Sequence, residues 1–443
     1  MRDDQKQLEV LAERACEQAK KLGASAARVT AGASTERKVV VRDGKLEQIQ
    51  SASSRSLVLH LYVDGRYGSH VTSVLDDRAL AAFMGRAVEM TRVLSPDPHR
   101  QLVAPRLQQG RSTADLGVYD PDHSKVEMAS HKARAMTAHD AARKAAGKSL
   151  LSSGGGAGDR VSVQVLRTTN GFADSEKRTS FSTWATVSVS DKDDKRPSDS
   201  QSDQARRYAD LRDPATLGVE AAERTLANVG ADAIATVTLP LIVENRAVGR
   251  LMSGLLSPLS GWALDQKRSC FEHSLGKAVG SELLHIVDDP LLQGGWGSRR
   301  FDGEGITAKR RALFNKGVLG TFFIDDYQGR KLGREATSGG ASNLVFGVGG
   351  ESLDALCARV GKAILITGFL GGNANSTTGD FSHGVRGFLI EGGKRSRPIA
   401  AMNVSGNHTA FWRGLQGLGD DPWPYGSIRA PSLVFGATTI AGR

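Results

Sequence analysis

Two Asp-Gly pairs, each set between strand-like runs, constrain the fold of this chain more than any other feature of its sequence. Asp43-Gly44 divides the stretch RKVVVRDGKLEQIQ, and Asp64-Gly65 follows the run SLVLHLYV. An Asp-Gly pair favours the tight turn of a β-hairpin, because both residues tolerate the positive φ angles which that turn needs. Apolar side chains alternate along the second run, at Leu57, Leu59, Leu61 and Val63. The N-terminal part therefore predicts an antiparallel sheet with one buried face.

Helical patterns surround these hairpins. Four segments carry apolar residues at helical spacing or helix-capping residues: 4–22, 76–94, 123–147 and 213–230. The last of them opens with Asp213 as a cap and Pro214 at the first helical position. Before it, the run SSGGGAGD at 152–159 predicts a break in the chain, with strands expected at 160–168 and 180–190.

The length indicates two domains, because 443 residues exceed what one hydrophobic core usually serves. The boundary is expected near 231–236, which gives domains at 1–233 and 234–443. The second half is rich in strand-like runs such as AILITGFLGG, and only 244–257 and 351–361 have helical character. The predicted fold class is α+β, with an N-terminal two-layer α/β domain followed by a mainly antiparallel β domain.

The net charge raises the question of a nucleic-acid partner. The chain has a formal charge of +10, but its Lys and Arg residues are scattered in short groups such as KRR at 309–311. No long basic stripe with interleaved aromatic residues occurs. A basic, solvated surface is therefore favoured over a nucleic-acid groove, and nucleic acid is not the expected partner.

Cysteine usage and the first residues bear on the compartment. Cys16, Cys270 and Cys357 lie far apart and form no CxxC pair, which argues against a disulfide framework and against a thiolate zinc site. The opening stretch MRDDQKQLEV lacks the apolar core of a signal peptide, and no run of about 18 apolar residues occurs. We expect a cytoplasmic protein that does not bind membranes.

The stretch ENRAVGR at 244–250 has the spacing of a metal-ligand frame at the start of a helix. In such a frame two histidines hold Zn²⁺, and a glutamate takes a proton from the metal-bound water. Here the three positions hold Asn245, Arg246 and Arg250. Asparagine is a weak ligand, and an arginine neither accepts a proton nor tolerates a neighbouring cation. We expect no metal and no catalytic residue at these positions.

A second segment, EHSLGKAVGSELLHIVDD at 272–289, holds further residues of metal-ligand type. Glu282 and His285 have the i, i+3 spacing of one half of a carboxylate-bridged metal site, and His273 precedes them. The other half is missing, so a polar rim on a β-rich domain is favoured over a metal site. No GxSxG elbow occurs anywhere in the sequence, which argues against a serine hydrolase.

The most distinctive candidate for ligand binding is the glycine-rich stretch FLGGNANSTTGDFSHGVRGF at 369–388. Gly, Asn, Ser and Thr at this density let a ligand approach the backbone closely, and long loops in compact domains are often functional. A plain hairpin connection is the equal alternative. The candidate substrate-binding residues are Gly372, Asn373, Asn375, Gly379, Asp380, Phe381, Ser382 and His383.

Taken together, several stretches resemble the TldD/PmbA family, and within it the PmbA (TldE)-like branch. They follow the family's order along nearly the whole chain. Among them are VRDGKLEQIQSASSRSLVLHLYVDGRYGSHVTS, DPATLGVEAAERTL, SELLHIVDD, GTFFIDDYQGRKLG, TTGDFSHGVRGFLIEGGK and NVSGNHTAFWRGLQGLGDD. The resemblance thus covers both expected domains.

The resemblance implies a function that the residues alone do not. The family pairs a TldD-type zinc metallopeptidase, which carries HExxxH and a later cysteine ligand, with a TldE-type chain that lacks them. The heterodimer cleaves unfolded peptides, including leader segments. By this likeness Asn245, Arg246 and Arg250 stand at the His, Glu and His positions, and Tyr425 stands at the cysteine position. This chain would be the non-catalytic subunit, with zinc in its partner.

Two alternatives remain open. One is a basic regulatory or nucleic-acid-associated protein, in line with the family's label as a DNA gyrase modulator. The other is a homodimeric hydrolase that uses His273, Glu282 and His285, and a homodimer is also conceivable for the chain when it is alone.

Overall fold

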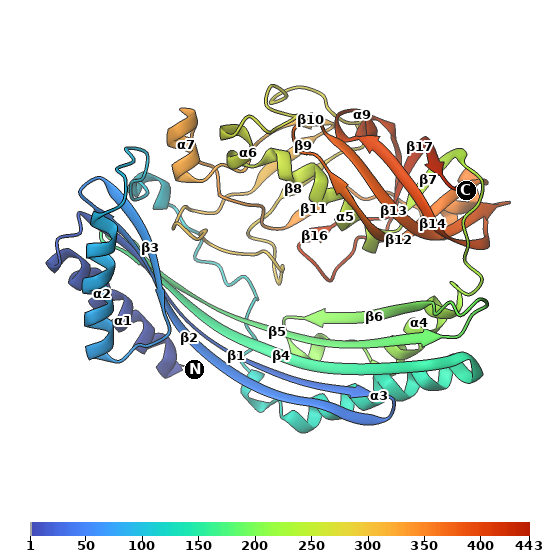
Figure 1. Ribbon diagram of the computed structural model, residues 1–443, viewed down its shortest axis with the longest axis horizontal. Helices are drawn as coiled ribbons and strands as arrows, with labels where there is room; N and C mark the ends of the chain where they lie inside the picture. The colour runs from blue at the N-terminus through green and yellow to red at the C-terminus, as the bar shows by residue number, and fades with distance from the viewer. Residues whose placement is uncertain (1) are drawn as a thin grey trace. The chain divides into compact units, whose positions relative to one another are not determined.

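The structure, a computed structural model, describes residues 2–443 (Figure 1). It divides into two compact units. The first contains the described chain up to Val187 together with Asp199–Ala222 and Arg300–Ala308. The second contains Ser188–Ser198, Glu223–Arg299 and Lys309–Arg443.

The first unit is built on a six-stranded sheet in the order β3-β2-β1-β4-β5-β6. Its strands are β1 (Ala26–Arg42), β2 (Lys45–Val63), β3 (Arg66–Thr72), β4 (Leu150–Thr168), β5 (Ala173–Val189) and β6 (Ser198–Ala205). Both predicted hairpins are confirmed, because Asp43-Gly44 joins β1 to β2 and Asp64-Gly65 joins β2 to β3. All four turn residues have φ between 48° and 79°, as this two-residue turn requires.

Helices cover one face of this sheet. They are α1 (Arg2–Lys21), α2 (Asp77–Arg92), α3 (Met128–Ala146) and α4 (Pro214–Leu226), which agree with the four predicted segments. Leu8 of α1 and Met84 of α2 share a buried cluster with Leu61 of β2. Further along the sheet, Ala135 of α3 packs against Val39 of β1. The alternating apolar residues of the strands therefore face the helices.

The predicted break at 152–159 is wrong, because these residues lie inside β4. At Gly155 a Cβ atom would stand 2.2 Å from the carbonyl oxygen of Ala135 on α3. At Gly156 it would stand 2.3 Å from the indole of Trp184 on β5. Neighbouring residues of a strand face opposite sides, so the glycines let a helix and an aromatic ring approach the strand closely from its two faces.

The second unit contains two sheets. The larger has the order β14-β13-β12-β7-β17-β15 and is made of β7 (Val237–Val243), β12 (Ala363–Ala374), β13 (Asp380–Glu391), β14 (Lys394–Asn407), β15 (Leu415–Leu418) and β17 (Leu433–Ala441). Since β14 also pairs with β17, five of these strands form a closed ring. The smaller, β10-β9-β8-β11-β16, is made of β8 (Ile286–Asp288), β9 (Arg311–Asn315), β10 (Val318–Leu319), β11 (Leu344–Phe346) and β16 (Ile428–Arg429).

Strand pairing in the second unit is mainly antiparallel. The parallel pairs are β7 with β12 and β11 with β16. The α+β prediction, with a β-rich second half, is therefore confirmed.

Helices of the second unit are α5 (Asn245–Leu256), α6 (Gly261–Asp265), α7 (Asp326–Leu332), α8 (Leu353–Val360) and α9 (His408–Phe411). The two predicted helices correspond to α5 and α8. The other three were missed because each spans two turns or fewer, which is too short for a periodic apolar pattern.

The stretch 369–388 is mostly strand rather than loop. It covers the end of β12 and the start of β13, which pair antiparallel, and only residues 375–379 lie between them. The high content of Gly, Asn and Ser follows from the irregular pairing, since the register of β12 shifts twice near Gly368 and Gly371.

None of the described helices combines the length and the hydrophobicity that crossing a bilayer requires. Cys16, Cys270 and Cys357 are free thiols. Burial raises the pKa of the Cys16 thiol and that of Cys270 to about 11, so neither is a reactive thiolate near neutral pH.

Candidate functional site

The residues singled out at 244–250 lie where β7 ends and α5 begins. β7 is a central strand of the larger sheet, with β12 parallel on one side and β17 antiparallel on the other. The buried face of α5 carries Ala247, Val248, Leu251, Met252, Gly254 and Leu255. Arg246 and Arg250 are one turn apart and less buried than this face, so their side chains project away from the core.

Glu244, between the strand and the helix, is fixed by a buried ion pair. The residue is 7% exposed, and its two carboxylate oxygens accept hydrogen bonds from Arg224 Nη1 and Nη2 at 2.9 and 2.8 Å. Its backbone N–H donates to the carbonyl oxygen of Ile366 on β12. The bidentate ion pair with Arg224 and this backbone hydrogen bond together fix the position of Glu244, from which α5 leaves the sheet.

Asn245 is tied to the segment that precedes β17. Its Nδ2 donates to the carbonyl oxygen of Asp421 at 2.7 Å, and its backbone N–H donates to Ser432 Oγ at 3.1 Å. Ser432 in turn donates from its backbone N–H and from its hydroxyl to the carboxylate of Asp421, both at 2.8 Å. The Asn245 side chain therefore joins two segments far apart in sequence.

Arg246 reaches the aromatic residues of the same segment. Its guanidinium carbon lies 5.9 Å from the centre of the Trp423 ring, a cation–π distance. The Trp423 ring meets that of Tyr425 edge-on, with 4.9 Å between centres. The structure thus places the Trp423–Tyr425 pair beside the start of α5.

Arg250 makes its contact on another side, with the β12–β13 hairpin. Its Nη2 donates to the carbonyl oxygen of Gly372 at 2.7 Å. Gly372 faces His383 across the hairpin and has φ of 121°, a value that residues with side chains rarely adopt. A Cβ atom there would also stand 2.1 Å from the carbonyl oxygen of Ser382. Glycine is therefore required at position 372.

Two buried histidines are packed together here: His383 belongs to strand β13 of this hairpin, and His408 begins α9. Phe381 stacks on His383, with 5.6 Å between ring centres, and packs against His408 at 4.7 Å. Trp412 Nε1 donates to His408 Nδ1 at 3.1 Å. Neither ring nitrogen of His383, nor Nε2 of His408, forms a hydrogen bond of normal geometry with any residue in the described chain.

Both histidines are uncharged near neutral pH. Burial lowers the pKa of His408 to about 4, helped by the neighbouring His383. Burial also lowers the pKa of His383, and the positive charge of Arg250 lowers it further, against an opposing contribution from the backbone of Gly371. The cluster thus packs against the hairpin as uncharged aromatic rings.

The candidate substrate-binding residues divide into two groups. Gly372, Asn373, Asn375, Asp380 and Ser382 are exposed, whereas Gly379, Phe381 and His383 are buried. Within the exposed group, Asn375 Oδ1 accepts from the backbone N–H of Thr377 at 2.9 Å, and Asp380 accepts from Asn407 Nδ2 at 2.7 Å. Hydrogen bonds from Thr378 and Asn407 lower the pKa of Asp380.

The residues of metal-ligand type in the segment 272–289 do not lie together. His273 and Glu282 are exposed and His285 is half-buried, and β8 occupies only the end of the segment. Across residues 2–443 no three His, Cys, Asp or Glu side chains converge in a way that would hold a metal ion.

The residues around the start of α5 do not suit a zinc ion. The two arginines there are permanently charged, so they repel a cation and offer no lone pair to it. Asn245 already uses its amide nitrogen on Asp421 and its amide oxygen on the backbone N–H of Arg246. The chemistry that this arrangement offers is recognition of carbonyl or carboxylate oxygens by guanidinium groups.

Sequence reasoning missed several residues of this site, namely Arg224, His408, Asp421, Trp423 and Ser432. Each lies outside the quoted motif and reaches it only through the fold. Trp423 lies two residues before Tyr425 in the sequence, but its contact with Arg246 could not be read from the sequence.

Profiles of known protein families match three parts of the chain. Domain 1 of the PmbA/TldA metallopeptidases matches residues 27–91, the central domain 121–229 and the C-terminal domain 236–442. Metalloprotease PmbA of Escherichia coli O157:H7 is 27% identical over 94% of this chain and 92% of its own length. In Haemophilus influenzae both a metalloprotease PmbA homologue, 26% identical over 97% of this chain, and a TldD homologue, 27% identical over 42% of it, are similar to the chain.

Solved structures have the same fold. A protein of Bacteroides thetaiotaomicron, described as a candidate modulator of DNA gyrase, is 37% identical over 98% of both chains, with a TM-score of 0.94. TldE of Thermococcus kodakarensis is 18% identical over 98% of this chain and all of its own, with a TM-score of 0.87, which is a likeness of fold alone.

Proposed function

Because this chain belongs to the PmbA/TldD metallopeptidase family, we propose that it is the non-catalytic, TldE-like subunit of a two-chain zinc peptidase. The partner would be a TldD-type chain that holds the zinc ion. The substrate class would be unfolded peptides, with leader-peptide processing as one use.

One observation carries the proposal, and it is the chemistry at the start of α5. Asn245, Arg246 and Arg250 each contact protein atoms that stabilise the local fold, namely Asp421, Trp423 and Gly372. A metal-binding frame that had merely lost one ligand would keep the others. Here all three positions carry groups that do not bind zinc, and two of them are cations. This supports a subunit that builds a site together with another chain and does not catalyse by itself.

The existence of a partner has separate support. Haemophilus influenzae and Buchnera aphidicola from Acyrthosiphon pisum each contain a PmbA homologue and a TldD homologue, both similar to this chain. Two chains of one family in one cell are what a heterodimer requires.

In the proposed complex this chain would help to hold an extended peptide. The exposed residues Asn373, Asn375, Asp380 and Ser382 offer polar groups along the β12–β13 hairpin. The buried Phe381 and His383 would shape this surface without touching the peptide. Main-chain hydrogen bonds to a strand give affinity that tolerates many sequences, as cleavage of unfolded peptides needs.

The test is reconstitution with the TldD-type chain of the source cell. Purified separately and together, the two chains would be assayed for bound zinc and for cleavage of an unfolded peptide. We expect zinc only in the partner chain and not in this chain. We expect cleavage only when the two chains are combined. The single variants Asn245→Ala, Arg246→Ala and Arg250→Ala should each cleave within about twofold of the wild-type complex. Replacing the glutamate of the partner's HExxxH should abolish cleavage. Stoichiometric zinc and cleavage in this chain alone would refute the proposal and revive the homodimeric hydrolase.

A second candidate function rests on a different observation. The relative of known structure that is 37% identical is described as a candidate modulator of DNA gyrase, and this chain has a net charge of +10. This second function is tested by measuring binding to duplex DNA with fluorescence anisotropy from about 50 to 200 mM salt. A steep loss of affinity with salt supports a nucleic-acid role, and no binding at about 150 mM salt removes it.

A further inference from the structure

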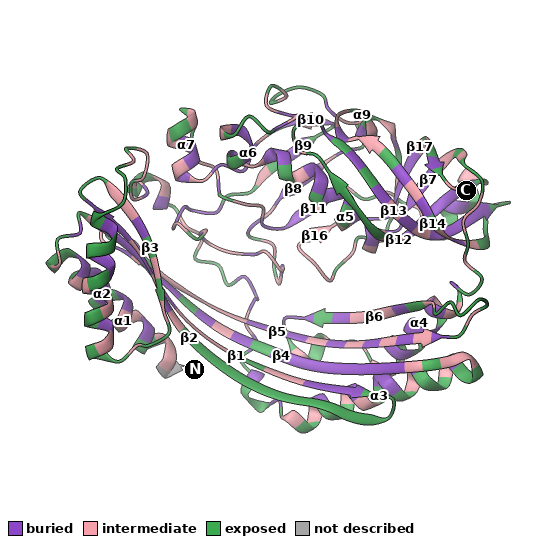
Figure 2. Cartoon of the chain, viewed as in Figure 1, coloured by how far each residue is buried: buried purple, intermediate pink, exposed green. Residues whose placement is uncertain are grey.

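The first part of β2, residues 45–56, has a neighbouring strand on only one side. β1 pairs with β2 along its whole length, from Lys45 to Tyr62, but β3 pairs only with Leu57–Val63. Within the described chain no strand lies against the outer edge of residues 45–56. Figure 1 shows the blue β2 continuing well past the end of β3, and Figure 2 shows this part of the strand exposed.

The direction of the backbone groups along this edge follows from the hairpin turn. Val63 and Arg66 close the two-residue turn at Asp64-Gly65, so their N–H and C=O groups point at each other. Peptide groups alternate sides with a period of two along a strand. The odd-numbered residues Ile49, Ser51, Ser53 and Arg55 therefore direct their N–H and C=O groups outward, away from β1.

This edge lacks the features that usually prevent strand pairing. Proteins protect free edges with prolines, central charges, very short strands or covering segments. From Gln48 to Ser54 the sequence QIQSASS contains no proline and no charge. Ile49 is 54% exposed on the strand. A bulge at Glu47, where the register with β1 shifts, marks the end of the regular part.

We propose that the outer edge of β2 pairs antiparallel with the same edge of a second copy of this chain, about a two-fold axis at Ser51. The regular part, residues 48–56, is about 30 Å long. Pairing would join two six-stranded sheets into one continuous sheet. The inference does not depend on the proposed peptidase role, because it concerns only copies of this chain.

Charge selects the register and the partner. With the axis at Ser51, Glu47 of each copy lies opposite Arg55 of the other, which gives two complementary pairs. Moving the axis by one residue to position 50 places Lys45 opposite Arg55, a like-charge contact. An axis at position 52 pairs Glu47 with Leu57, which is already bound to β3. The edge is thus self-complementary in one register.

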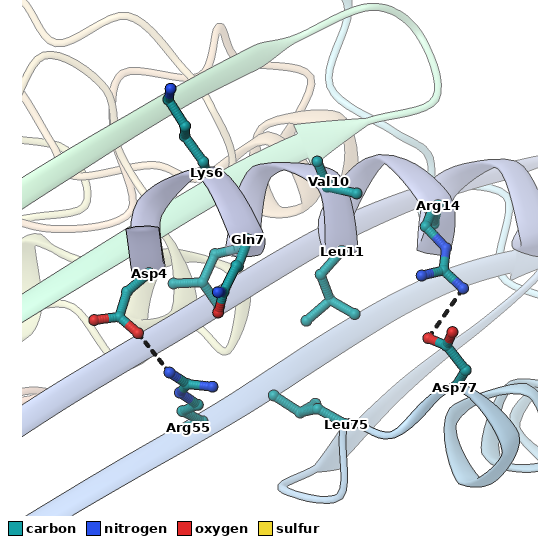
Figure 3. Close-up of a pocket in the computed structure, with 10 residues that line it drawn as sticks. Asp4, Lys6, Gln7, Val10, Leu11, Arg14, Arg55, Leu75 and Asp77 are labelled. Atoms are coloured by element: carbon teal, nitrogen blue, oxygen red, sulfur yellow. Dashed lines mark hydrogen bonds and ion pairs between the residues drawn. The ribbon is translucent and has the colours of Figure 1, made fainter. Parts of the chain in front are cut away.

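Both charged side chains remain accessible for this contact. Arg55 is 56% exposed and pairs with Asp4 of α1, while Glu47 is 46% exposed and pairs with Arg42. Arg55 and Asp4 line a cavity of about 430 Å³ together with other residues of α1 and with Leu75 and Asp77. Figure 3 shows the ion pair between Arg55 and Asp4. Exposed ion pairs of this kind are worth less than about 1 kcal/mol, so they do not withhold either group from a new partner.

The first experiment measures the native mass of the full chain by sedimentation over a range of concentrations. We expect a dimer of twice 47.1 kDa that dissociates at least tenfold more easily in Ser51→Pro. Proline at this position removes an outward N–H and leaves the ladder to β1 intact. Ser51→Ala keeps the N–H and is the matched control.

A charge exchange tests the register. Arg55→Glu should weaken the dimer, and the double variant Glu47→Arg, Arg55→Glu should restore it, because the exchanged charges again lie opposite each other. Restoration would not occur if these residues were merely solvated, and that result would overturn the register.

Cross-linking provides a test that does not depend on affinity. In the proposed register Ser51 meets Ser51 of the other copy with Cα atoms about 5.5 Å apart, which suits a disulfide. Ser51→Cys should therefore form a covalent dimer on mild oxidation. Ser53→Cys should not, because the two cysteines would lie about 14 Å apart. Equal cross-linking of both variants, or a monomer at every concentration, overturns the proposal. Competition of an extended peptide for the edge of a monomeric chain would assign the edge to peptide instead.

Discussion

Each unit of the molecule contains two buried histidines that share a neighbour, but the two pairs differ in what that neighbour is. In the first unit His123 and His131 both contact the carboxylate of Asp159, whose side chain is fully buried. Arg37 also donates to this carboxylate, at 2.8 Å. In the second unit His383 and His408 pack against Phe381, with no carboxylate in contact.

The difference shows how one residue type serves two kinds of core. Burial by itself raises the pKa of Asp159, but hydrogen bonds from His123, His131 and Arg37 outweigh it and hold this pKa well below its usual range. The carboxylate is therefore an ionic centre that organises its neighbours. In the second unit, His383 and His408 are uncharged rings that pack in an aromatic cluster.

The largest expected effect is the loss of the ionic centre. Asp159→Asn removes the charge that Arg37 faces and should lower the free energy of unfolding by about 3–5 kcal/mol, the usual cost of leaving a buried charge without its partner. Urea unfolding followed by circular dichroism measures it. Asp140→Asn is the control, because Asp140 contacts His139 from an exposed position and should change stability by less than about 0.5 kcal/mol. Equal losses in both variants would contradict the contrast.

Acid should act on the neutral pair. The pKa of His408 is about 4 in the folded chain and about 6.5 in the unfolded chain, so the unfolded chain binds more protons between these values. Stability is then fully present above pH 6.5 and falls on acidification toward pH 4, by on the order of 3 kcal/mol from this group. His408→Asn keeps an acceptor for Trp412 and should remove this part of the pH dependence. His273→Asn, at an exposed position, should leave the dependence unchanged.

The β12–β13 hairpin should tolerate no side chain at position 372, where its two strands lie close together. Gly372→Ala combines a positive φ with a clash against the backbone of Ser382, and should cost about 2–4 kcal/mol. Gly392→Ala has a positive φ of 59° but open space around it, and should cost only about 1 kcal/mol. Thermal unfolding separates the two. If both variants lose the same stability, the close packing of the hairpin is not what constrains position 372.

The smallest effect concerns the charge beside the neutral pair. Arg250→Gln removes a cation near His383 and should move the pKa of this histidine upward, toward its ordinary value. NMR titration of the histidine ring protons measures the direction. Arg246→Gln, whose guanidinium lies at Trp423, should leave that pKa unchanged.

The sequence predicted a helix or a turn correctly where all the residues that determine it lie close together in the chain. The Asp-Gly turns and the longer helices follow from residues within one turn or one helix of each other. The glycine run in β4 failed because its cause lies elsewhere: the space it leaves is filled by α3 and by Trp184, which no local pattern reveals. The same holds for 369–388, where irregular pairing between two strands was taken for a loop.

The candidate site was predictable as a set of positions but not as an arrangement. The likeness to a family drew attention to Asn245, Arg246, Arg250 and Tyr425. The residues that contact them could not be predicted from the sequence, because Asp421 lies 176 residues from Asn245 and Gly372 lies 122 residues from Arg250. The pairing of β7 with β12 on one side and with β17 on the other brings these segments together.

The glycines of β4 carry a lesson for mutational surveys. A Cβ atom added at Gly155, Gly156 or Gly158 would lie within 2.4 Å of an existing atom. Nearly every substitution at these positions should therefore unfold or distort the first unit. A scan of all substitutions would score these positions as intolerant, as it would score residues that perform chemistry. Intolerance in this protein is therefore an unreliable guide to activity wherever two packed layers share one strand.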